Sequence, residues 1–480
     1  MLNHHEVTYF SITRALRIQG WEHLDAVILA ALATESPVLL VGSHGTAKTL
    51  LVERLAWALA LKLHHYNASL LNYDDLVGIP LPEEGNTRLR FISTPAAVWD
   101  AEFVFFDEIS RCRPDLQNKL YPIIHERRVI GMPLVNLRFR WAAMNPPSPD
   151  EPDLDKPAHE YYLGSEPLDP ALTDRFPFVV PVPKWGQLSK DDRRRIITWR
   201  DRQAAVDGVV GERPLVELVH DCAARIPQVE EEFGDWITDY VICVVDLLEK
   251  AKLPESPRRA NMLARSIAAV HAARLVLEGD DVELEASGEV GLLYGLPQNA
   301  TDTPPTEAAV VAVHKQAWEI ASRMDDDAWR QVFEESNPVR RVLVADELGF
   351  EDEDLARLIT QALGAHESDA RKVGLATAIF LAFRERRQLT PAAWEPLVKL
   401  ASYALEPRCE TLPLAPNSND LNIWNEIKEW VTKRTETGVL ADLEVNYVLG
   451  GFPNLWRRYN WKEALEAFRD DLALFSIQGQ

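Results

Sequence analysis

Cysteine is scarce in this sequence. The 480 residues contain four cysteines, Cys112, Cys222, Cys243 and Cys409. Their spacing does not match the ligand pattern of a zinc site, and they are too few for a disulfide framework. We therefore expect buried or free thiols in a reducing compartment.

Positive charge is also in short supply. Lysine and arginine number 51 against 74 aspartates and glutamates, which gives a formal net charge of −23. An acidic surface repels phosphate backbones and disfavours a nucleic-acid motor, although a basic channel can hide within an acidic total. One local cluster is basic although the chain as a whole is acidic: Arg193, Arg194, Arg195, Arg200 and Arg202. Flanking aspartates favour a solvated helix face as its explanation.

Long apolar runs are missing too. No window of about eighteen apolar residues occurs, so no transmembrane helix is predicted. Residues 1–14 contain His4, His5 and Glu6 and no apolar segment of the kind that a signal peptide needs. The predicted location is the cytoplasm.

Hydrophobic periodicity divides the chain into an α/β part and a helical remainder. Four short apolar segments predict buried parallel strands with helices between them, a pattern typical of doubly wound α/β domains. The segments are Val38–Val41, Phe103–Phe106, Trp141–Met144 and Val179–Val182. The predicted domains are an α/β core over residues 1–186, an all-α subdomain over 187–287, a Gly/Pro-rich linker over 288–305 and a mainly helical domain over 306–480.

A candidate phosphate-binding loop, GSHGTAKT, joins the first predicted strand to a helix. Glycines let backbone N–H groups wrap a polyphosphate, and the helix N-terminus favours negative charge. Lys48 can reach the β- and γ-phosphates of ATP, and the Thr49 hydroxyl can bind Mg²⁺. The predicted nucleotide-binding residues are Gly42, Ser43, His44, Gly45, Thr46, Ala47, Lys48, Thr49 and Leu50.

Ala47 stands where this kind of loop usually has glycine. A methyl group is tolerable there if the residue keeps a negative φ.

Polar residues follow two of the other predicted strands. Asp107 and Glu108 come directly after one of them, and Asn145 follows the next. The ends of parallel strands face the ligand crevice of such domains. Asp107 can hold Mg²⁺, Glu108 can polarise the attacking water, and Asn145 can orient that water or sense the γ-phosphate.

Taken together, these motifs resemble the MoxR/RavA family of AAA+ ATPases over about residues 19–277. GSHGTAKT is similar to the family's GxPGxAKT loop, so Ala47 matches the family while His44 departs from its proline. FFDEISRCRPDLQNKLYPIIHERRV, AAMNPP, LDPALTDRF and SPRRANMLARSIAAVHAARL resemble further family segments.

The resemblance assigns roles to two arginines. It implies that Arg175 is an arginine finger donated to the neighbouring subunit and that Arg258 is the sensor-2 arginine of the lid. Arg259 competes with Arg258, which is preferred because it follows Pro257 directly. Arg111 and Arg113 are further candidates for facing a neighbouring subunit. Guanidinium suits these roles because it is always charged and can fork onto phosphate oxygens.

The family also has two inserted hairpins that project into or around a ring pore. Residues 76–93 and 127–139 resemble them here, and ordinary surface hairpins would give the same pattern. Residues 306–480 match no motif. Their aromatic and arginine-rich segment, 452–461, favours a packed terminal helix over a binding surface.

The resemblance implies a P-loop AAA+ core, an all-α lid and an enzyme that hydrolyses ATP, with Mg²⁺, to ADP and phosphate. It implies a ring, commonly a hexamer, that works with a von Willebrand A domain protein to remodel, activate or mature a client protein. Arg258 would couple hydrolysis to a movement of the lid.

Two alternatives remain. A nucleic-acid-directed motor or antiviral-defence ATPase is disfavoured by the acidic total. A nucleotide-gated scaffold with little turnover is disfavoured because all the hydrolytic residues are in place. The sequence does not identify the client or the partner.

Overall fold

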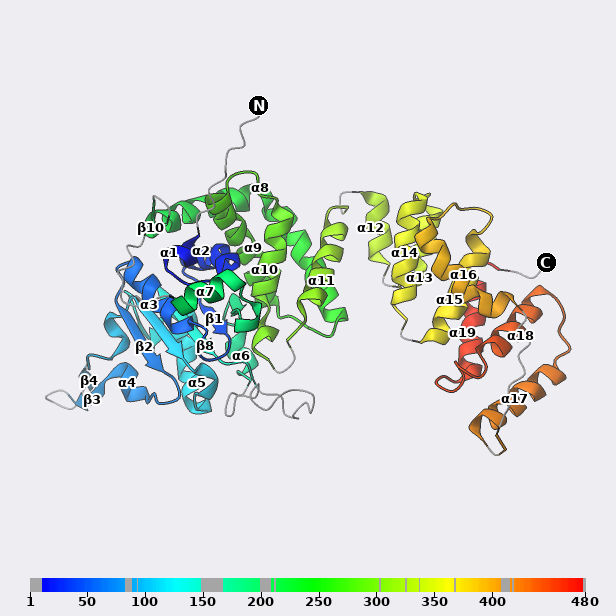
Figure 1. Ribbon diagram of the computed structural model, residues 1–480, viewed down its shortest axis with the longest axis horizontal. Coiled ribbons are helices and arrows are strands. Elements are labelled where there is room, and N and C mark those ends of the chain that lie inside the picture. The colour runs from blue at the N-terminus through cyan, green and yellow to red at the C-terminus, as the bar shows by residue number, and fades with distance from the viewer. Residues whose placement is uncertain are drawn as a thin grey trace, which may run out of the picture. The chain divides into compact units, whose positions relative to one another are not determined.

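The computed structural model describes residues 11–82, 89–92, 94–147, 167–198, 209–210, 213–301, 304–323, 326–335, 337–366, 368–406, 415–416 and 418–477. The chain divides into two compact units, Met1–Ala321 and Ser322–Gln480, each considered by itself below. Figure 1 labels the helices and strands of both units.

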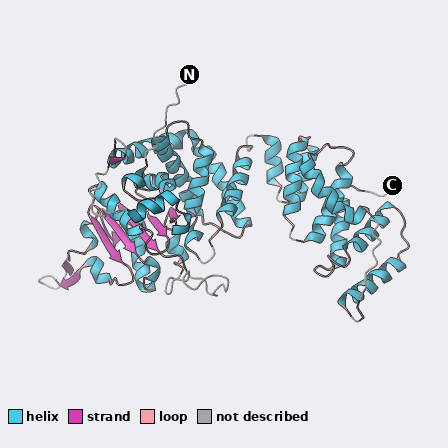
Figure 2. Cartoon of the chain, in the orientation of Figure 1, coloured by secondary structure: helices cyan, strands magenta, loops and turns pink. Residues whose placement is uncertain are grey.

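Unit 1 is built on a five-stranded parallel sheet in the order β2-β5-β8-β1-β9. Its strands are β1 (Val38–Val41), β2 (Leu63–Asn67), β5 (Phe103–Asp107), β8 (Phe139–Met144) and β9 (Phe178–Pro181). Helices lie beside the strands, as Figure 2 shows. The predicted α/β fold with a parallel sheet is therefore confirmed.

Four of these strands match the predicted segments, and β2 was missed. Its sequence is Leu-His-His-Tyr-Asn, in which His64 and Tyr66 are buried while His65 and Asn67 are exposed. An edge strand needs no continuous apolar run, so the signal that identifies a central strand is absent from it. Strand β2 pairs only with β5 among the described strands.

The remaining elements up to the end of the sheet are short. The helices are α1 (Ile12–Ala15), α2 (Asp25–Ala33), α3 (Lys48–Ala58), α4 (Tyr73–Val77), α5 (Pro114–Tyr121) and α6 (Pro170–Thr173). Two antiparallel strand pairs, β3 (Ile79–Pro82) with β4 (Leu89–Ile92) and β6 (Arg128–Val129) with β7 (Met132–Pro133), lie at the two predicted hairpins. The Glu-Gly-Asn sequence at residues 84–86 predicts the tip of the first hairpin, and these residues lie outside the described part of the chain.

After the sheet, the described part of unit 1 is almost entirely helical. It contains α7 (Lys190–Thr198), the small strands β10 (Val209–Val210) and β11 (Arg213–Pro214), α8 (Leu215–Lys250), α9 (Pro257–Glu278), α10 (Leu284–Gly295) and α11 (Glu307–Ala321). The apolar pattern predicts two helical stretches, over residues 215–224 and 236–248, whereas α8 is one helix across both. Pro227 and the glutamates that follow interrupt the apolar pattern, but α8 packs along α9 and α11 and stays helical through them.

The predicted linker over residues 288–305 is wrong. Helix α10 occupies much of it, and its glycines are packing positions rather than flexible ones. A Cβ added at Gly291 would lie 2.6 Å from Ile267 Cγ1, and one at Gly295 would lie 2.6 Å from Leu263 Cδ2. The division between the units falls after Ala321 instead, because α11 packs against α8 and α10.

Unit 2 is helical wherever it is described, as predicted. Its helices are α12 (Asp327–Glu334), α13 (Pro338–Glu347), α14 (Asp352–Gly364), α15 (Asp369–Phe383), α16 (Pro391–Leu405), α17 (Asn419–Lys433), α18 (Val439–Gly451) and α19 (Trp461–Leu474). One hydrophobic core joins them. Trp456 and Trp461 belong to that core, and Trp456 Nε1 donates to the Val448 carbonyl at 2.7 Å. The aromatic residues of segment 452–461 thus pack inside the unit.

The turn from β1 into α3 contains a strained residue. Ala47 has φ = 71°, so the condition of a negative φ is not met. Gly45, in the same loop, also has a positive φ, of 75°. The left-handed conformation costs an alanine about 1–2 kcal/mol, a cost that glycine avoids.

We predict that Ala47→Gly stabilises the region around α3 by roughly 0.5–1 kcal/mol, because the relieved strain exceeds the extra entropy of the unfolded glycine. Hydrogen exchange of α3 amides measures this. The control is Ala264→Gly in the middle of α9, which should cost about 1 kcal/mol. A loss of stability in Ala47→Gly would contradict the left-handed geometry.

In unit 2 we predict that Gly450→Ala is destabilising by about 1–3 kcal/mol or more. The added Cβ would lie 2.1 Å from the Tyr403 backbone oxygen, which cannot move aside without shifting α16. Gly364→Ala is the matched control, because nothing lies within 4 Å of its Cβ position. Denaturant unfolding of both variants checks this, and equal midpoints would contradict the packing of α18 on α16.

Candidate active site

A pocket of about 800 Å³ opens at the carboxyl ends of the parallel strands. The loops that follow β1, β5, β8 and β9 line it. Of the predicted nucleotide-binding residues, all from Ser43 to Leu50 line the pocket, and so do Asp107, Glu108 and Asn145. Gly42 contributes its carbonyl to the loop that forms the pocket floor. The sheet therefore brings the predicted catalytic, metal and phosphate groups to one place.

Lys48 begins α3 and is held at the centre of the loop. Its Nζ donates to the carbonyls of Gly42 at 2.6 Å and Ser43 at 2.9 Å, and the residue is 8% exposed. Burial lowers the pKa of Lys48, while the carboxylates of Asp107 and Glu108 act in the opposite direction. Carbonyl acceptors satisfy the ammonium without cancelling its charge, so the loop presents a cation to the pocket.

Thr49 and Asp107 meet across the pocket. The Thr49 hydroxyl donates to Asp107 Oδ2 at 3.0 Å. Burial would raise the pKa of Asp107, but hydrogen bonds from His65 and Thr49 and from the Glu108 N–H outweigh it and lower the pKa. Asp107 is therefore an anion at neutral pH, and together with a hydroxyl it offers the oxygen ligands that Mg²⁺ prefers.

His65 is a residue that the sequence did not single out. It lies on β2, and its Nε2 is 3.6 Å from Asp107 Oδ2. The parallel register pairs His65 with Phe105, so the side chain lies next to the end of β5. No sequence signal could have found it, because β2 itself was not predicted.

Glu108 follows β5 in the left-handed conformation, with φ = 57°. Its Oε2 lies 3.0 Å from Arg111 Nε in the same chain. Arg113 lies 3.8 Å from Asp115. Asn145, 5% exposed, ends β8 on the same side of the pocket. A base and an amide thus stand beside the phosphate-loop lysine.

Apolar side chains also line the pocket, together with Arg17, Gln19 and Arg54. Its lining includes Ile18, Trp21, Trp185, Leu188 and Ile196. Trp185 is 51% exposed and Ile196 41% exposed, so both offer surface to a flat ring. A pocket that combines a cationic loop with an apolar wall fits a nucleoside triphosphate.

A second cavity, of about 780 Å³, lies at the opposite ends of the strands. Pro37 lines it, whereas Ser43 lines the first pocket, and the extended chain between them spans roughly 20 Å. The charged residues that line it are Glu35, His125, Arg127, Arg140, Arg175, Glu230, Arg258 and Arg265. The second cavity is therefore strongly basic.

The positive charge of this cavity affects the pKa values of two groups that line it, His125 and Arg140. Burial lowers the pKa of His125, and the charges of Arg175 and Arg258 lower it further. Burial also lowers the pKa of Arg140 to about 9, with Arg127 adding to the effect. Arg140 remains a cation at neutral pH and donates to the carbonyls of Ile124 and Glu35.

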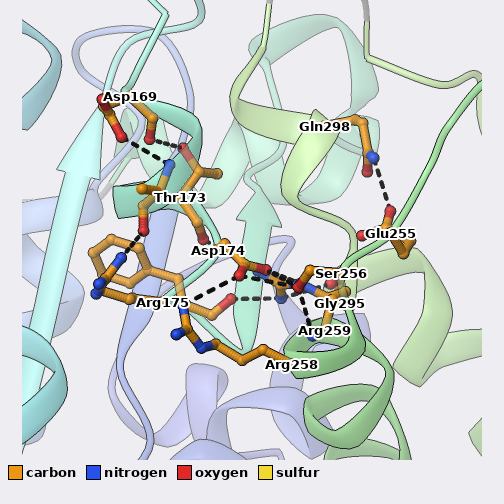
Figure 3. Close-up of polar contacts among 12 residues, drawn as sticks. Asp169, Thr173, Asp174, Arg175, Glu255, Ser256, Arg258, Arg259, Gly295 and Gln298 are labelled. Carbon is orange, nitrogen blue, oxygen red and sulfur yellow. Dashed lines mark hydrogen bonds and ion pairs between the residues drawn. The ribbon is translucent and has the colours of Figure 1, made fainter.

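Arg175 and Arg258 thus lie together and apart from the first pocket. Arg175 follows α6, and its guanidinium stacks 4.6 Å from the centre of the Tyr121 ring. Arg258, in the first turn of α9, lies 3.4 Å from Asp174. Figure 3 shows both side chains beside Asp174.

Arg259 is buried in the core and has no exposed surface. Its guanidinium donates to the carbonyls of Thr173, Phe176 and Gly295 at 2.8–3.1 Å. A side chain so enclosed cannot reach a ligand. Of the two adjacent arginines, only Arg258 is available for a phosphate, and its side chain is 47% exposed.

The basic cluster on α7 makes local contacts. Arg193 donates to the Gly186 carbonyl at 2.8 Å, and Arg195 lies 3.7 Å from Asp192. No residue of α7 is buried. This agrees with a solvated helix face, and Arg200 and Arg202 lie outside the described residues. Among the described helices, none is both long and apolar enough to cross a membrane.

Comparison with known proteins agrees with this geometry. Residues 37–176 match the family described as AAA domain (dynein-related subfamily). Uncharacterized protein YojN of Bacillus subtilis is 31% identical over 188 residues, which are 36% of this chain and 57% of YojN. Chaperone MoxR1 of Mycobacterium tuberculosis is 30% identical over 183 residues, 38% of this chain and 44% of MoxR1.

A crystal structure from Cytophaga hutchinsonii, provisionally assigned as an ATPase, covers 65% of this chain and 92% of its own, at 22% identity and a TM-score of 0.45. The chain spans about half the length of the curated relatives that it matches. The matched region coincides with the parallel sheet from β1 to the turn before β9. Residues 37–176 therefore form an AAA domain that is similar to part of a MoxR protein, in agreement with the phosphate loop and the acidic strand.

Proposed function

We propose that unit 1 binds ATP in the first pocket and hydrolyses it at the interface with a second copy of the chain. One observation carries the proposal. Lys48, Thr49, Asp107, Glu108 and Asn145 share the first pocket, whereas both arginines expected at the phosphates line the second cavity at the other end of the sheet.

Within the first pocket, each residue has a role that its position supports. The loop N–H groups and Lys48 bind the phosphates, and Thr49 with Asp107 would hold Mg²⁺. The metal, when bound, neutralises charge on the phosphate oxygens. Glu108 orients the attacking water and draws off its proton, and Asn145 fixes that water from the end of β8. The apolar wall binds the base.

Arg175 and Arg258 act on the nucleotide of the neighbouring subunit. A residue at the amino ends of the strands cannot reach phosphates at the carboxyl ends of the same short sheet. Two copies related by rotation can bring the second cavity of one against the first pocket of the other, which is a head-to-tail contact that generates a ring. We propose a ring of this kind, a hexamer, with Arg258 acting in trans alongside Arg175.

The work done by hydrolysis is proposed to be the remodelling, activation or maturation of a partner protein, together with a von Willebrand A domain protein. Support comes from the similarity to a protein named as a chaperone. The nucleic-acid alternative gains no support from α7, where Arg193 and Arg195 make local contacts.

We predict that Glu108→Gln binds ATP with unchanged affinity but turns it over about 10²- to 10⁴-fold more slowly, because the amide cannot accept the proton of the attacking water. Steady-state phosphate release and binding of a fluorescent ATP analogue measure the two properties. Asp115→Asn, an acid 65% exposed and paired with Arg113, is the control and should turn over normally. Turnover at the normal rate in Glu108→Gln would remove Glu108 from this role.

We predict that Arg175→Ala lowers turnover by roughly 10³-fold or more, the typical loss when an arginine finger is removed. ATP affinity of the isolated chain should not change, since Arg175 lies outside its own pocket. Mixing Arg175→Ala subunits with Lys48→Ala subunits should restore part of the activity, because the second variant has no working pocket but still supplies Arg175.

The control for this experiment is Arg195→Ala, which removes an exposed arginine that pairs only with Asp192 among the described residues. It should be fully active without mixing. If mixing never restores activity to Arg175→Ala, Arg175 does not act across an interface and the proposed assembly is wrong.

A further inference from the structure

The side chain of Arg259 holds the turn that contains Arg175 in place. This buried guanidinium donates to the carbonyls of Thr173 and Phe176, which bracket Arg175 along the chain. Its third bond is to Gly295, at the end of α10. Releasing the turn would leave a buried cation without acceptors, which is strongly unfavourable. Helices α9 and α10 therefore hold the turn in place.

Asp174 joins the two candidate trans-acting arginines. It precedes Arg175 directly, and its carboxylate accepts the Ser256 hydroxyl at 3.1 Å from each oxygen. Arg258 NH1 lies 3.4 Å from Oδ2, and Arg259 Nε lies 3.5 Å from Oδ1. Figure 3 shows this carboxylate at the centre of the contacts between α6 and α9.

The charge of Asp174 is not needed to cap α9. Ser256 is the N-cap residue, and its hydroxyl already accepts the N–H of Arg259 at 3.0 Å. Arg259 NH1 and NH2 donate to three carbonyls, while its buried Nε makes no hydrogen bond and faces Asp174 Oδ1 at 3.5 Å. What the carboxylate adds is an anion 3.4 Å from an arginine that is otherwise 47% exposed, and so it restricts where Arg258 can point.

Arg175 is oriented by its own neighbours. One NH group donates to the Ala171 carbonyl, and the guanidinium stacks on Tyr121. Its backbone N–H donates to the Leu172 carbonyl at 3.0 Å. The direction of Arg175 therefore depends on the turn, and the turn depends on Asp174 and Arg259.

We infer that Asp174 is a positioning residue, which fixes Arg258 and the turn of Arg175 relative to each other so that the two cations meet the neighbouring nucleotide together. This rests on the proposed function, since it requires that both arginines act across the interface. Reacting groups that are displaced by about 1 Å lose on the order of 10²-fold in rate. A variant that loosens the pair should therefore affect turnover rather than binding.

Asp174→Asn tests this directly. The amide keeps the shape and can still accept the Ser256 hydroxyl, but it has no charge to hold Arg258. We expect kcat for ATP to fall ~10- to 100-fold, with ATP-analogue affinity of the chain within twofold of normal. Asp280→Asn is the matched control: Asp280 is an exposed carboxylate that pairs with a different arginine, Arg225, and neither residue lines the two cavities, so kcat should not change.

Mixing experiments exclude a merely structural role. Asp174→Asn subunits keep a working pocket, and Lys48→Ala subunits keep an intact pair of arginines. Mixing the two should raise turnover per working pocket towards the normal value, as for Arg175→Ala. Normal kcat in Asp174→Asn alone would overturn the inference, and so would a loss of kcat that mixing cannot restore.

These outcomes separate the inference from the proposed function. If Arg175→Ala is restored by mixing and Asp174→Asn is fully active, the assembly stands and the positioning role fails. If Arg175→Ala is not restored, the trans arrangement itself fails, whatever Asp174→Asn shows.

Discussion

The parallel pairing of β1 with β8 on one side and β9 on the other determines where every candidate group lies. Val38 pairs with both Trp141 and Phe178, and Val41 pairs with both Met144 and Pro181. The three strands therefore end together, whereas β8 begins earlier, at Phe139. The phosphate loop and Asn145 follow from their carboxyl ends, whereas the turn of Arg175 leads into the amino end of β9. The same alignment thus assembles half of an active site at one edge and exposes two candidate trans-acting cations near the other.

Buried cations near both ends of the parallel strands are stabilised in the same way. Lys48 donates to two backbone carbonyls, and Arg140 and Arg259 also donate to backbone carbonyls. A carbonyl satisfies an N–H group without cancelling its charge, in contrast to a carboxylate. Two of these cations, Lys48 and Arg140, line cavities. The fold therefore keeps positive potential in both cavities despite a net charge of −23. This explains how an acidic chain can bind a polyphosphate.

Local sequence patterns predicted those elements that a short stretch of sequence is enough to specify. Strands β1, β5, β8 and β9 are short apolar runs, and the phosphate loop follows one of them, so the lining of the first pocket could be anticipated. Strand β2 could not, because an edge strand has no such run, and His65 was missed with it. The glycines of α10 favour a linker when only composition is considered, because composition does not distinguish glycines at packing positions from glycines in flexible segments. The left-handed Ala47 could not be foreseen, because its φ is imposed by the turn.

The choice between Arg258 and Arg259 shows a further limit of sequence reasoning. The two residues are adjacent and chemically identical, and only the packing of α9 against α6 and α10 decides which one is enclosed. The second cavity was invisible for the same reason, because its arginines come from segments far apart in the chain. No spacing rule links Arg127, Arg140, Arg175 and Arg265, although all four line one cavity.

The contacts around Arg175 also restrict how the domain can move. Phe178 is only three residues beyond Arg175, and its register with Val38 ties the turn to the central strand that leads into the phosphate loop. Arg259 ties the same turn to α9, so this helix cannot swing away from the sheet without breaking bonds to Thr173 and Phe176. Within one chain, the distance between Arg175 and Lys48 is therefore fixed. Under the proposed function, a cycle that brings these arginines towards a neighbour's nucleotide and withdraws them would therefore move one subunit against the other. In that case the helical lid would move together with the sheet and the turn of Arg175, and not separately from them.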